Sequence, residues 1–360
     1  MAHILWLAGT AGAGKSVTAW EVFQKAPGLA YVDIDQLGML YPDRPDDEEA
    51  HRLKQEALRA LAPQYLTAGA ERLLVSGVVD PELAADPDAP LPPGTVDYCL
   101  LVADPDDLRR RILERGWEAD DADRAVATQE LLVVSGFAES VVHTQGRSVS
   151  EVSAAVPREA SDSTAPGTRQ SDPDVLRAGA STGSVFITGP RAVGCSTVGF
   201  ALASHAWELG VPTGFVDLDQ LSFRQHGSST RDVCLGIANL GALQRVFARH
   251  GAERFIANGH LLETAHLDLL RRSLGPTTVV CLRADHETLR RHLVRRLGGS
   301  EARLAGDDLA DASDAYRRAV LRRAVTELAA TEQADRYDIV VDVAGRSVTE
   351  VVAEIAAAVW

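Results

Sequence analysis

The stretch that decides the fold is Gly9-Thr10-Ala11-Gly12-Ala13-Gly14-Lys15-Ser16. An apolar run from Ile4 to Ala8 precedes it, and a helix-compatible segment from Val17 to Gln24 follows it. This is a complete G-x-x-x-x-G-K-[ST] phosphate loop in the context the motif requires, between a strand and a helix. The sequence therefore predicts a nucleotide site in which residues 9–17, Val17 included, contact the phosphates.

Each residue type in this loop has a chemical purpose. Glycines let successive backbone N–H groups converge on phosphate oxygens, and the helix that follows presents its positive end. Lysine reaches the β- and γ-phosphates and the serine hydroxyl ligates Mg²⁺, which makes Lys15 a catalytic candidate and Ser16 a metal ligand candidate. Lys15 is one of three lysines in a chain that otherwise uses arginine, with Lys25 and Lys54.

A second loop of the same plan, Gly189-Pro190-Arg191-Ala192-Val193-Gly194-Cys195-Ser196, follows the apolar segment Val185 to Thr188. Cys195 stands where the first loop has lysine, and a thiol carries no positive charge at neutral pH. Two interpretations stay open. The second loop binds no nucleotide, or Arg191 partly replaces the missing charge.

Four further matches follow the two loops in the same order, which predicts a tandem duplication. The pairs of matching segments are 31–37 with 215–221, 69–77 with 251–259, 101–110 with 282–291, and 146–152 with 345–351. Between the copies lies a stretch rich in Ser, Thr, Pro and Ala, which is linker composition. We expect a domain with the intact loop at 1–156, a flexible linker at 157–183 and a degenerate domain at 184–360.

The chain of 360 residues has a net charge of −15, which argues against a nucleic-acid or anionic-membrane partner. Its four cysteines form no C-x-x-C pair, so we expect buried, reduced thiols in a cytoplasmic protein. No apolar run approaches the length of a membrane span.

Apolar strand patterns alternate with helical patterns in each copy, which is typical of a parallel sheet covered by helices on both faces. In the first copy the patterns predict strands at 3–8, 29–34, 72–77, 96–102 and 140–143, and helices at 15–25, 46–68, 106–115, 123–135 and 148–156. Functional groups in such sheets lie at the carboxyl ends of the strands. The loop, Asp33, Asp35 and Gly77 all fall there.

With these motifs in place, each copy resembles the P-loop small-molecule kinases, such as shikimate kinase, gluconate kinase and chloramphenicol phosphotransferase. The resemblance rests on the phosphate loop, the Asp-x-Asp at 33–35, a small-residue turn at 76–77, and Ala103-Asp104 with Leu108-Arg109-Arg110 before a lid. It implies an α/β protein with two tandem P-loop NTPase domains, each a five-stranded parallel sheet with helices on both faces. The single glycine of the turn at 76–79 departs from the shikimate kinase pattern, so shikimate is a poor substrate hypothesis.

The resemblance also implies ATP and Mg²⁺ as cofactors, a small hydroxylated molecule as acceptor, and roles for particular residues. Asp35 would bind or deprotonate the acceptor hydroxyl, and Asp33 would hold a Mg²⁺-bound water. Gly146 and Arg147 look like part of the loop that lies against the adenine. From the residues alone, the alternative for 33–35 is an acidic turn in which one aspartate caps the next helix.

Arginines near the lid are the remaining candidates. Arg109, Arg110, Arg111 and Arg115 share one predicted helix and cannot all face the phosphates. We expect Arg115, and with it Arg111, to contact the γ-phosphate or the lid, against the alternative of a solvated basic face. Contact between the domains, with an arginine from 295–323 serving the first site, is a further hypothesis.

Two functions from different classes follow. The first is ATP- and Mg²⁺-dependent phosphoryl transfer by the N-terminal domain, with the C-terminal domain degenerate or regulatory. The second is a nucleotide-binding or ATPase switch, or a pseudokinase-like interaction protein, without a small acceptor. An Asp-x-Asp favours the kinase because a plain switch needs no acceptor base, and a decayed second copy favours the switch.

Overall fold

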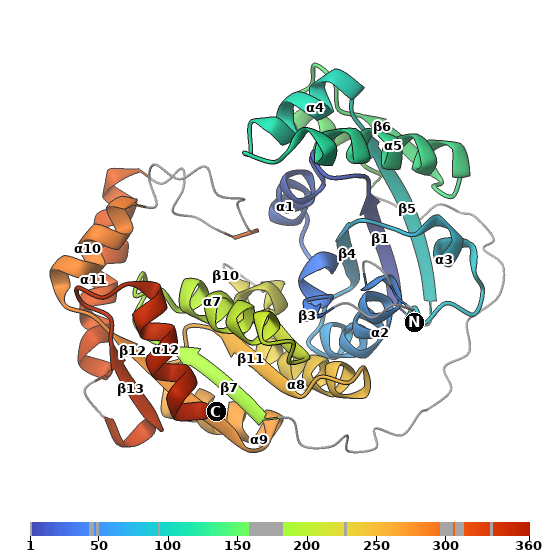
Figure 1. Cartoon of the computed structure of the whole chain (residues 1–360). Helices are drawn as coiled ribbons and strands as arrows, with labels where there is room; N and C mark the ends of the chain where they lie inside the picture. The colour runs from blue at the N-terminus through green and yellow to red at the C-terminus, as the bar shows by residue number, and fades with distance from the viewer. Residues whose placement is uncertain are drawn as a thin grey trace. The chain divides into compact units, whose positions relative to one another are not determined.

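The computed structural model describes residues 2–42, 47, 50–92, 94–157, 183–226, 229–295, 305–306, 313–331 and 334–360. It divides into two compact units, and neither is one continuous stretch of chain. Unit 1 comprises residues 1–38, 47–175 and 223–232, and unit 2 comprises residues 39–46, 176–222 and 233–360. Each unit therefore includes a short segment from the other half of the sequence (Figure 1).

Unit 1 is built on a seven-stranded sheet in the order β10-β9-β2-β4-β1-β5-β6. The strands from β2 to β6 in this order pair in parallel, and β9 pairs antiparallel with β2. Their bounds are Ala2–Ala8 (β1), Leu29–Asp33 (β2), Arg72–Gly77 (β4), Gly94–Val102 (β5), Ser140–His143 (β6), Phe223–His226 (β9) and Ser229–Arg231 (β10).

The helices of unit 1 connect these strands, and α1 packs against α6 while α4 packs against α5. The bounds are Lys15–Lys25 (α1), Ile34–Leu37 (the 3₁₀ helix η1), His51–Thr67 (α2), Pro81–Ala85 (α3), Pro105–Leu113 (α4), Ala119–Ser135 (α5) and Val149–Ala155 (α6). Asp104 starts α4 by accepting the N–H groups of Asp106 and Asp107, with Pro105 at the first helical position. A reciprocal capping box between Ser148 and Glu151 starts α6.

Unit 2 repeats this plan on a six-stranded sheet in the order β13-β12-β7-β11-β8-β3. The strands are Leu40–Tyr41 (β3), Gly183–Thr188 (β7), Thr213–Asp217 (β8), Arg254–Asn258 (β11), Thr277–Arg283 (β12) and Ile339–Asp342 (β13). The helices are Cys195–Glu208 (α7), Leu218–Leu221 (η3), Val233–Arg249 (α8), Thr264–Leu274 (α9), His286–Arg295 (α10), Asp314–Ala330 (α11), Ala334–Arg336 (η4) and Val348–Val359 (α12). Here α7 packs against α12, α8 against α9, and α10 against α11.

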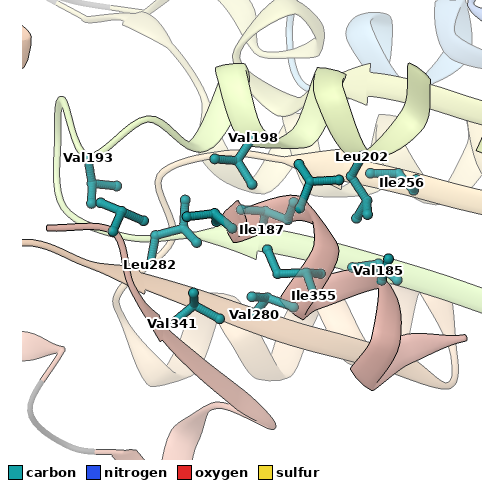
Figure 2. Packing of buried hydrophobic residues seen from close by; sticks show 14 of the residues in the cluster. Val185, Ile187, Val193, Val198, Leu202, Ile256, Val280, Leu282, Val341 and Ile355 are labelled. Atoms are coloured by element: carbon teal, nitrogen blue, oxygen red, sulfur yellow. The ribbon is translucent and has the colours of Figure 1, made fainter. Parts of the chain in front are cut away.

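Buried aliphatic side chains hold the sheet and helices of unit 2 together (Figure 2). Ile187 of β7, Leu202 of α7 and Ile355 of α12 are fully buried in this cluster. Removing apolar area from water contributes about 25 cal/mol per Å², so such a cluster is the main stabilising term of the unit. Val193 of the second phosphate loop belongs to the same cluster, which ties the loop to the core.

The added strand of unit 1 brings an aromatic side chain into its core. Phe223 of β9 is fully buried and packs with Trp20, Phe23 and Tyr31, with ring centroids 4.9–6.2 Å apart. The side-chain amide of Gln225 also donates to Phe23 O at 2.8 Å. In unit 2 the corresponding added strand is β3, where the ring of Tyr41 lies 4.9 Å from that of Trp207.

The expected α/β class is confirmed, with a small correction to the sheets. Five strands in each unit pair in parallel as expected, but antiparallel additions make the sheets seven- and six-stranded. The antiparallel strands were not predicted because they are too short for an alternating apolar pattern; β3, for example, has two residues. The domain boundaries at 156 and 184 and the duplication stay predictions, and nearly all of the expected linker lies outside the described residues.

The cysteines are all free, as expected, but they are not all buried. Cys99 and Cys281 are buried in the equivalent strands β5 and β12, and Cys195 is half-buried. Cys234 is exposed near the start of α8, so that part of the expectation is wrong. Within the described part of the chain, no helix is both long and apolar enough to cross a membrane.

Candidate nucleotide and acceptor site

The first phosphate loop joins the end of β1 to the start of α1. Gly14, the residue before α1, has a φ of 93°, a left-handed conformation that favours glycine. A Cβ on Gly9 would meet Leu101 O at 2.9 Å, so the loop passes too close to β5 for a larger residue. The first N–H groups of α1 have no partner within the helix. The loop and helix therefore form a cradle suited to phosphate oxygens.

Lys15 is held inside this loop. Its ammonium donates to Thr10 O at 2.8 Å, and the side chain is almost fully buried. Burial lowers the pKa of Lys15, while the nearby carboxylates of Asp35 and Asp33 act in the opposite direction. The Lys15 side chain is thus folded back on the loop and poorly solvated. A bound phosphate would neutralise its positive charge there.

Ser16 and Asp33 lie together, as their assignment to a metal site requires. The Ser16 hydroxyl donates to Asp33 Oδ2 at 3.2 Å, and Asp33 Oδ1 accepts the N–H of Asp35 at 3.1 Å. The second contact is the capping role that the sequence left open as an alternative, so Asp33 both caps η1 and faces Ser16. Burial, followed by the charge of Asp35, raises the pKa of Asp33 to about 6.

Asp35 lies two residues further on, in η1, and is the more exposed carboxylate. Its side chain is 44% exposed and makes an ion pair with Lys54 of α2 at 2.9 Å. A Cβ on Gly77, at the end of β4, would lie 3.5 Å from Asp35 Oδ2 and 2.1 Å from Ile34 Cγ2. Gly77, with φ of 145°, therefore lets η1 approach the end of β4.

Lys54 is the site residue that the sequence reasoning missed. Its side chain is only 12% exposed, and its stem lies across Gly38, where a Cβ would meet Lys54 Cε at 2.6 Å. The available signal was its rarity: two of the three lysines in the chain, Lys15 and Lys54, lie near the same pair of carboxylates.

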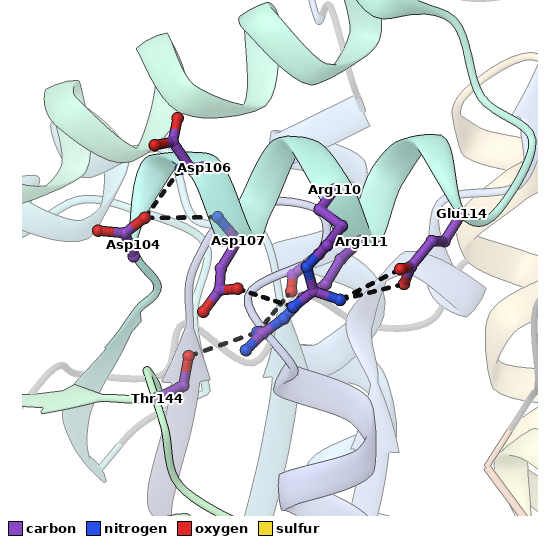
Figure 3. Close-up of polar contacts among 8 residues, drawn as sticks. Asp104, Asp106, Asp107, Arg110, Arg111, Glu114 and Thr144 are labelled. Carbon is purple, nitrogen blue, oxygen red and sulfur yellow. Dashed lines mark hydrogen bonds and ion pairs between the residues drawn. The ribbon is translucent and has the colours of Figure 1, made fainter.

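The arginines of α4 separate into two groups. Arg109 pairs with Asp123 of α5. Arg110 pairs with Asp107 and Glu114, at the two ends of its own helix (Figure 3). Arg111 instead donates to Gly12 O at 3.2 Å and to Thr144 Oγ1 at 3.5 Å. Arg115 follows α4, and its charge contributes to lowering the pKa of Lys15. Arg111 and Arg115 are thus the two that lie toward the loop.

Gly146 and Arg147 lie in the turn between β6 and α6. Gly146 has a φ of 66°, and the guanidinium of Arg147 donates to His143 O at 3.2 Å on the exposed surface. Since Arg111 bonds to Thr144, this turn and the phosphate loop share a contact through one side chain. The role of the turn in binding adenine remains a prediction.

The second loop has the same backbone but different side-chain chemistry. Burial, and then the charges of Cys281 and Asp217, raise the pKa of the Cys195 thiol, which is therefore neutral. The Ser196 hydroxyl donates to Asp217 Oδ2 at 2.8 Å, and the Asn258 amide donates to both. In the predicted match of 251–259 with 69–77, Asn258 aligns with Ser76, so the carboxylate here is satisfied by an internal donor.

Comparisons with known proteins found only distant similarities, all of them to solved structures. No protein-family model matches the sequence, and no curated protein matches it.

Solved structures similar to this chain include two kinases and one resistance protein. A gluconokinase from Sinorhizobium meliloti 1021 is 20% identical, with 50% of this chain and 92% of that chain covered and a TM-score of 0.34. The tunicamycin resistance protein of Deinococcus radiodurans is 17% identical, with coverages of 49% and 95% and a TM-score of 0.32. Shikimate kinase from Aquifex aeolicus is 18% identical, with coverages of 49% and 94% and a TM-score of 0.30. Each of these similarities covers about half of this chain and more than nine-tenths of the other protein.

Proposed function

We propose that unit 1 catalyses ATP- and Mg²⁺-dependent phosphoryl transfer to a hydroxyl group of a small molecule. In this proposal the catalytic residues all lie within 1–156, and the second copy is degenerate or regulatory. One observation carries it: a half-exposed carboxylate, Asp35, lies beside the buried Lys15 and the Ser16–Asp33 pair.

The phosphate loop supplies electrostatic stabilisation. Phosphoryl transfer depends mainly on positioning and on neutralising charge at the transferred group. Lys15 would move from Thr10 O to a phosphate oxygen, a short shift for a side chain already in the loop. Arg115 would add a second cation from the lid side, and Arg111 would hold the lid helix against Gly12.

Ser16 and Asp33 are the residues that would hold Mg²⁺. Mg²⁺ usually takes only one or two protein oxygens and completes its shell with water and phosphate, and a hydroxyl beside a carboxylate fits that demand. When bound, the ion would neutralise negative charge on the phosphates. The raised pKa of Asp33 favours the same assignment, because a nearby cation would relieve the burial of its charge.

Asp35 would orient the acceptor hydroxyl and accept its proton. The ion pair with Lys54, at 2.9 Å, fixes the direction of this carboxylate. A general base must come within hydrogen-bond reach of the proton it removes, and Asp35 has one oxygen, Oδ2, that is not used by Lys54.

The Lys54 contact also supports a second candidate, the nucleotide switch. If Asp35 serves only to hold Lys54 and α2, the site needs no acceptor, and nucleotide binding or hydrolysis alone would be its output. The two functions differ in where the phosphoryl group goes. A switch transfers it to water and releases inorganic phosphate, whereas a kinase transfers it to the acceptor.

The deciding experiment measures ADP and inorganic phosphate together, with and without a panel of sugars, sugar acids and other alcohols. The kinase proposal expects ADP formation that depends on one acceptor and exceeds phosphate release. Asp35→Asn should then lower turnover with the acceptor while leaving nucleotide affinity within about twofold. Equal ADP and phosphate with every acceptor would favour the switch, and no nucleotide binding would reject both.

A further inference from the structure

The second phosphate loop keeps the shape of an anion cradle although it lacks the lysine. Gly194 has a φ of 110°, and Ala192 has a φ of 64° where the first loop has Gly12 with 78°. A Cβ on Gly189 would meet Leu282 O at 2.6 Å, which repeats the close approach of Gly9 to Leu101. At these positions the second loop therefore keeps the backbone conformation of the first.

A carboxylate of the chain itself lies against this loop. Glu327 of α11 accepts the N–H of Arg191 through Oε2 at 3.0 Å. Its other oxygen, Oε1, lies 3.0 Å from His260 Nε2, 3.1 Å from Arg323 Nε and 3.5 Å from Arg191 Nε. The Glu327 side chain is only 13% exposed. One backbone donor, two guanidinium groups and one imidazole ring thus converge on a single, largely buried carboxylate.

The contacts of His260 join Glu327 to the backbone of the second phosphate loop. Its Nδ1 lies 2.8 Å from Gly189 O, and a carbonyl oxygen only accepts hydrogen bonds, so Nδ1 donates. The other ring nitrogen, Nε2, lies 3.0 Å from Glu327 Oε1. Arg191 and Arg323 place two positive charges beside the one negative charge of Glu327.

Burial raises the pKa of Glu327, but the hydrogen bond and charge of His260 and the contacts of Arg191 outweigh it, so the pKa is lowered. The carboxylate is thus held ionised. In the first loop the matching amide belongs to Ala11, and among the described residues no carboxylate is hydrogen-bonded to it.

We propose that the second phosphate loop is an anion-binding site that the chain fills with its own Glu327, and that a small phosphate anion competes with this carboxylate for the same donors. Binding of the anion requires Glu327 to leave, and with it the part of α11 that carries Arg323. With Glu327 in place, the loop binds no phosphate at moderate concentration, and Arg191 serves the carboxylate instead of replacing the missing lysine.

The test measures the affinity of the full chain for inorganic pyrophosphate by calorimetry, in a Lys15→Ala background that weakens the first loop. Adding Glu327→Ala is expected to tighten binding at least about tenfold, because the internal competitor no longer occupies the site. Glu327→Gln, which keeps the shape and removes the charge, is expected to tighten it in the same direction and carries the test if the alanine variant unfolds early in a thermal scan.

The matched control is Glu208→Ala. Glu208 is an exposed carboxylate at the last residue of α7, about 20 Å along that helix from the loop, and its removal should leave pyrophosphate affinity unchanged. Adding Arg191→Ala to the Glu327→Ala variant should abolish the gain in pyrophosphate affinity. The proposal is overturned if neither Glu327 variant binds more tightly, if Glu208→Ala gives the same gain, or if only ADP and not pyrophosphate gains affinity.

Discussion

The two phosphate loops have the same backbone and opposite internal charges. In the first loop a buried cation, Lys15, bonds to the loop carbonyl of Thr10, whereas in the second a partly buried anion, Glu327, bonds to the loop amide of Arg191. A side chain after the fourth parallel strand contacts each loop at the same place, Arg111 at Gly12 O and His292 at Ala192 O. The loop shape thus persists without the ligand chemistry when another group of the chain satisfies its polar atoms.

Of the differences between the two units, the largest effect of a substitution is expected at the antiparallel strands β9 and β3. Phe223 of β9 is fully buried in an aromatic cluster of unit 1, whereas Tyr41 of β3 in unit 2 is 37% exposed. Phe223→Ala should lower the free energy of unfolding by about 3–5 kcal/mol, as large-to-small changes of a buried phenylalanine do. Tyr41→Ala should cost clearly less. Urea unfolding followed by tryptophan fluorescence measures both, and equal losses would contradict the difference in burial.

The next largest effect separates the two loops directly. Lys15→Ala should lower turnover about 10²- to 10³-fold, the loss typical of one removed transition-state donor. Cys195→Ala, the same change at the matching position, should leave turnover unaltered because the thiol is neutral. Steady-state kinetics with saturating nucleotide measures this. Comparable losses from both changes would show that the second loop takes part in catalysis.

A third prediction concerns pH. The pKa of Asp33 is about 6 in the folded protein against 3.8 ordinarily, so between these values the native state binds more protons than the unfolded state. The free energy of unfolding should therefore fall as pH rises from about 4 to about 6, by on the order of 2–3 kcal/mol from this group in the absence of metal.

Asp33→Asn should remove that part of the slope, and urea unfolding at several pH values without divalent ions checks it. Asp217, the matching residue of unit 2, also has a raised pKa, caused first by burial and then by Asp219. Asp217→Asn should therefore remove a separate share of the slope. An Asp33→Asn profile parallel to that of the parent chain would refute the assignment.

The smallest effect concerns backbone strain in the second loop. Ala192 holds a left-handed conformation that costs a non-glycine residue about 1–2 kcal/mol. Ala192→Gly should raise stability by up to about 1 kcal/mol, since the greater freedom of glycine in the unfolded chain offsets part of the gain. Gly12→Ala should do the reverse, because its Cβ would also meet Ile112 and Leu108 at 3.2 Å. Thermal unfolding of the pair tests both signs.

The sequence predicted the parallel core of unit 1 closely. Its five predicted strands overlap β1, β2, β4, β5 and β6 with bounds within two residues, because each is a buried apolar run between turn residues. The helix predicted at 46–68 begins at His51 instead, preceded by Asp47, whose carboxylate accepts the N–H groups of Arg52 and Leu53. The short helix α3 was not predicted.

What the sequence did not predict are contacts made far along the chain. Glu327 bonds to an amide 136 residues away, and the Lys54–Asp35 pair joins two elements that no motif connects. The sequence around Glu327 and Lys54 contains no motif that indicates these contacts, and an isolated charge on a helix is usually solvated. The membership of β9 in the sheet of unit 1 was equally hidden, because edge pairing depends on backbone groups and leaves little trace in side-chain order.

The composition of unit 1 has a consequence for biosynthesis. Domains generally fold in the order in which the ribosome makes them, the N-terminal one first. Unit 1 includes residues 223–232, so the nascent chain has not yet produced the Phe223 ring or strand β9 when its first half is complete. The ribosome therefore begins with unit 1 but supplies its last residues only after translation has passed Asp232, well into the second half of the message.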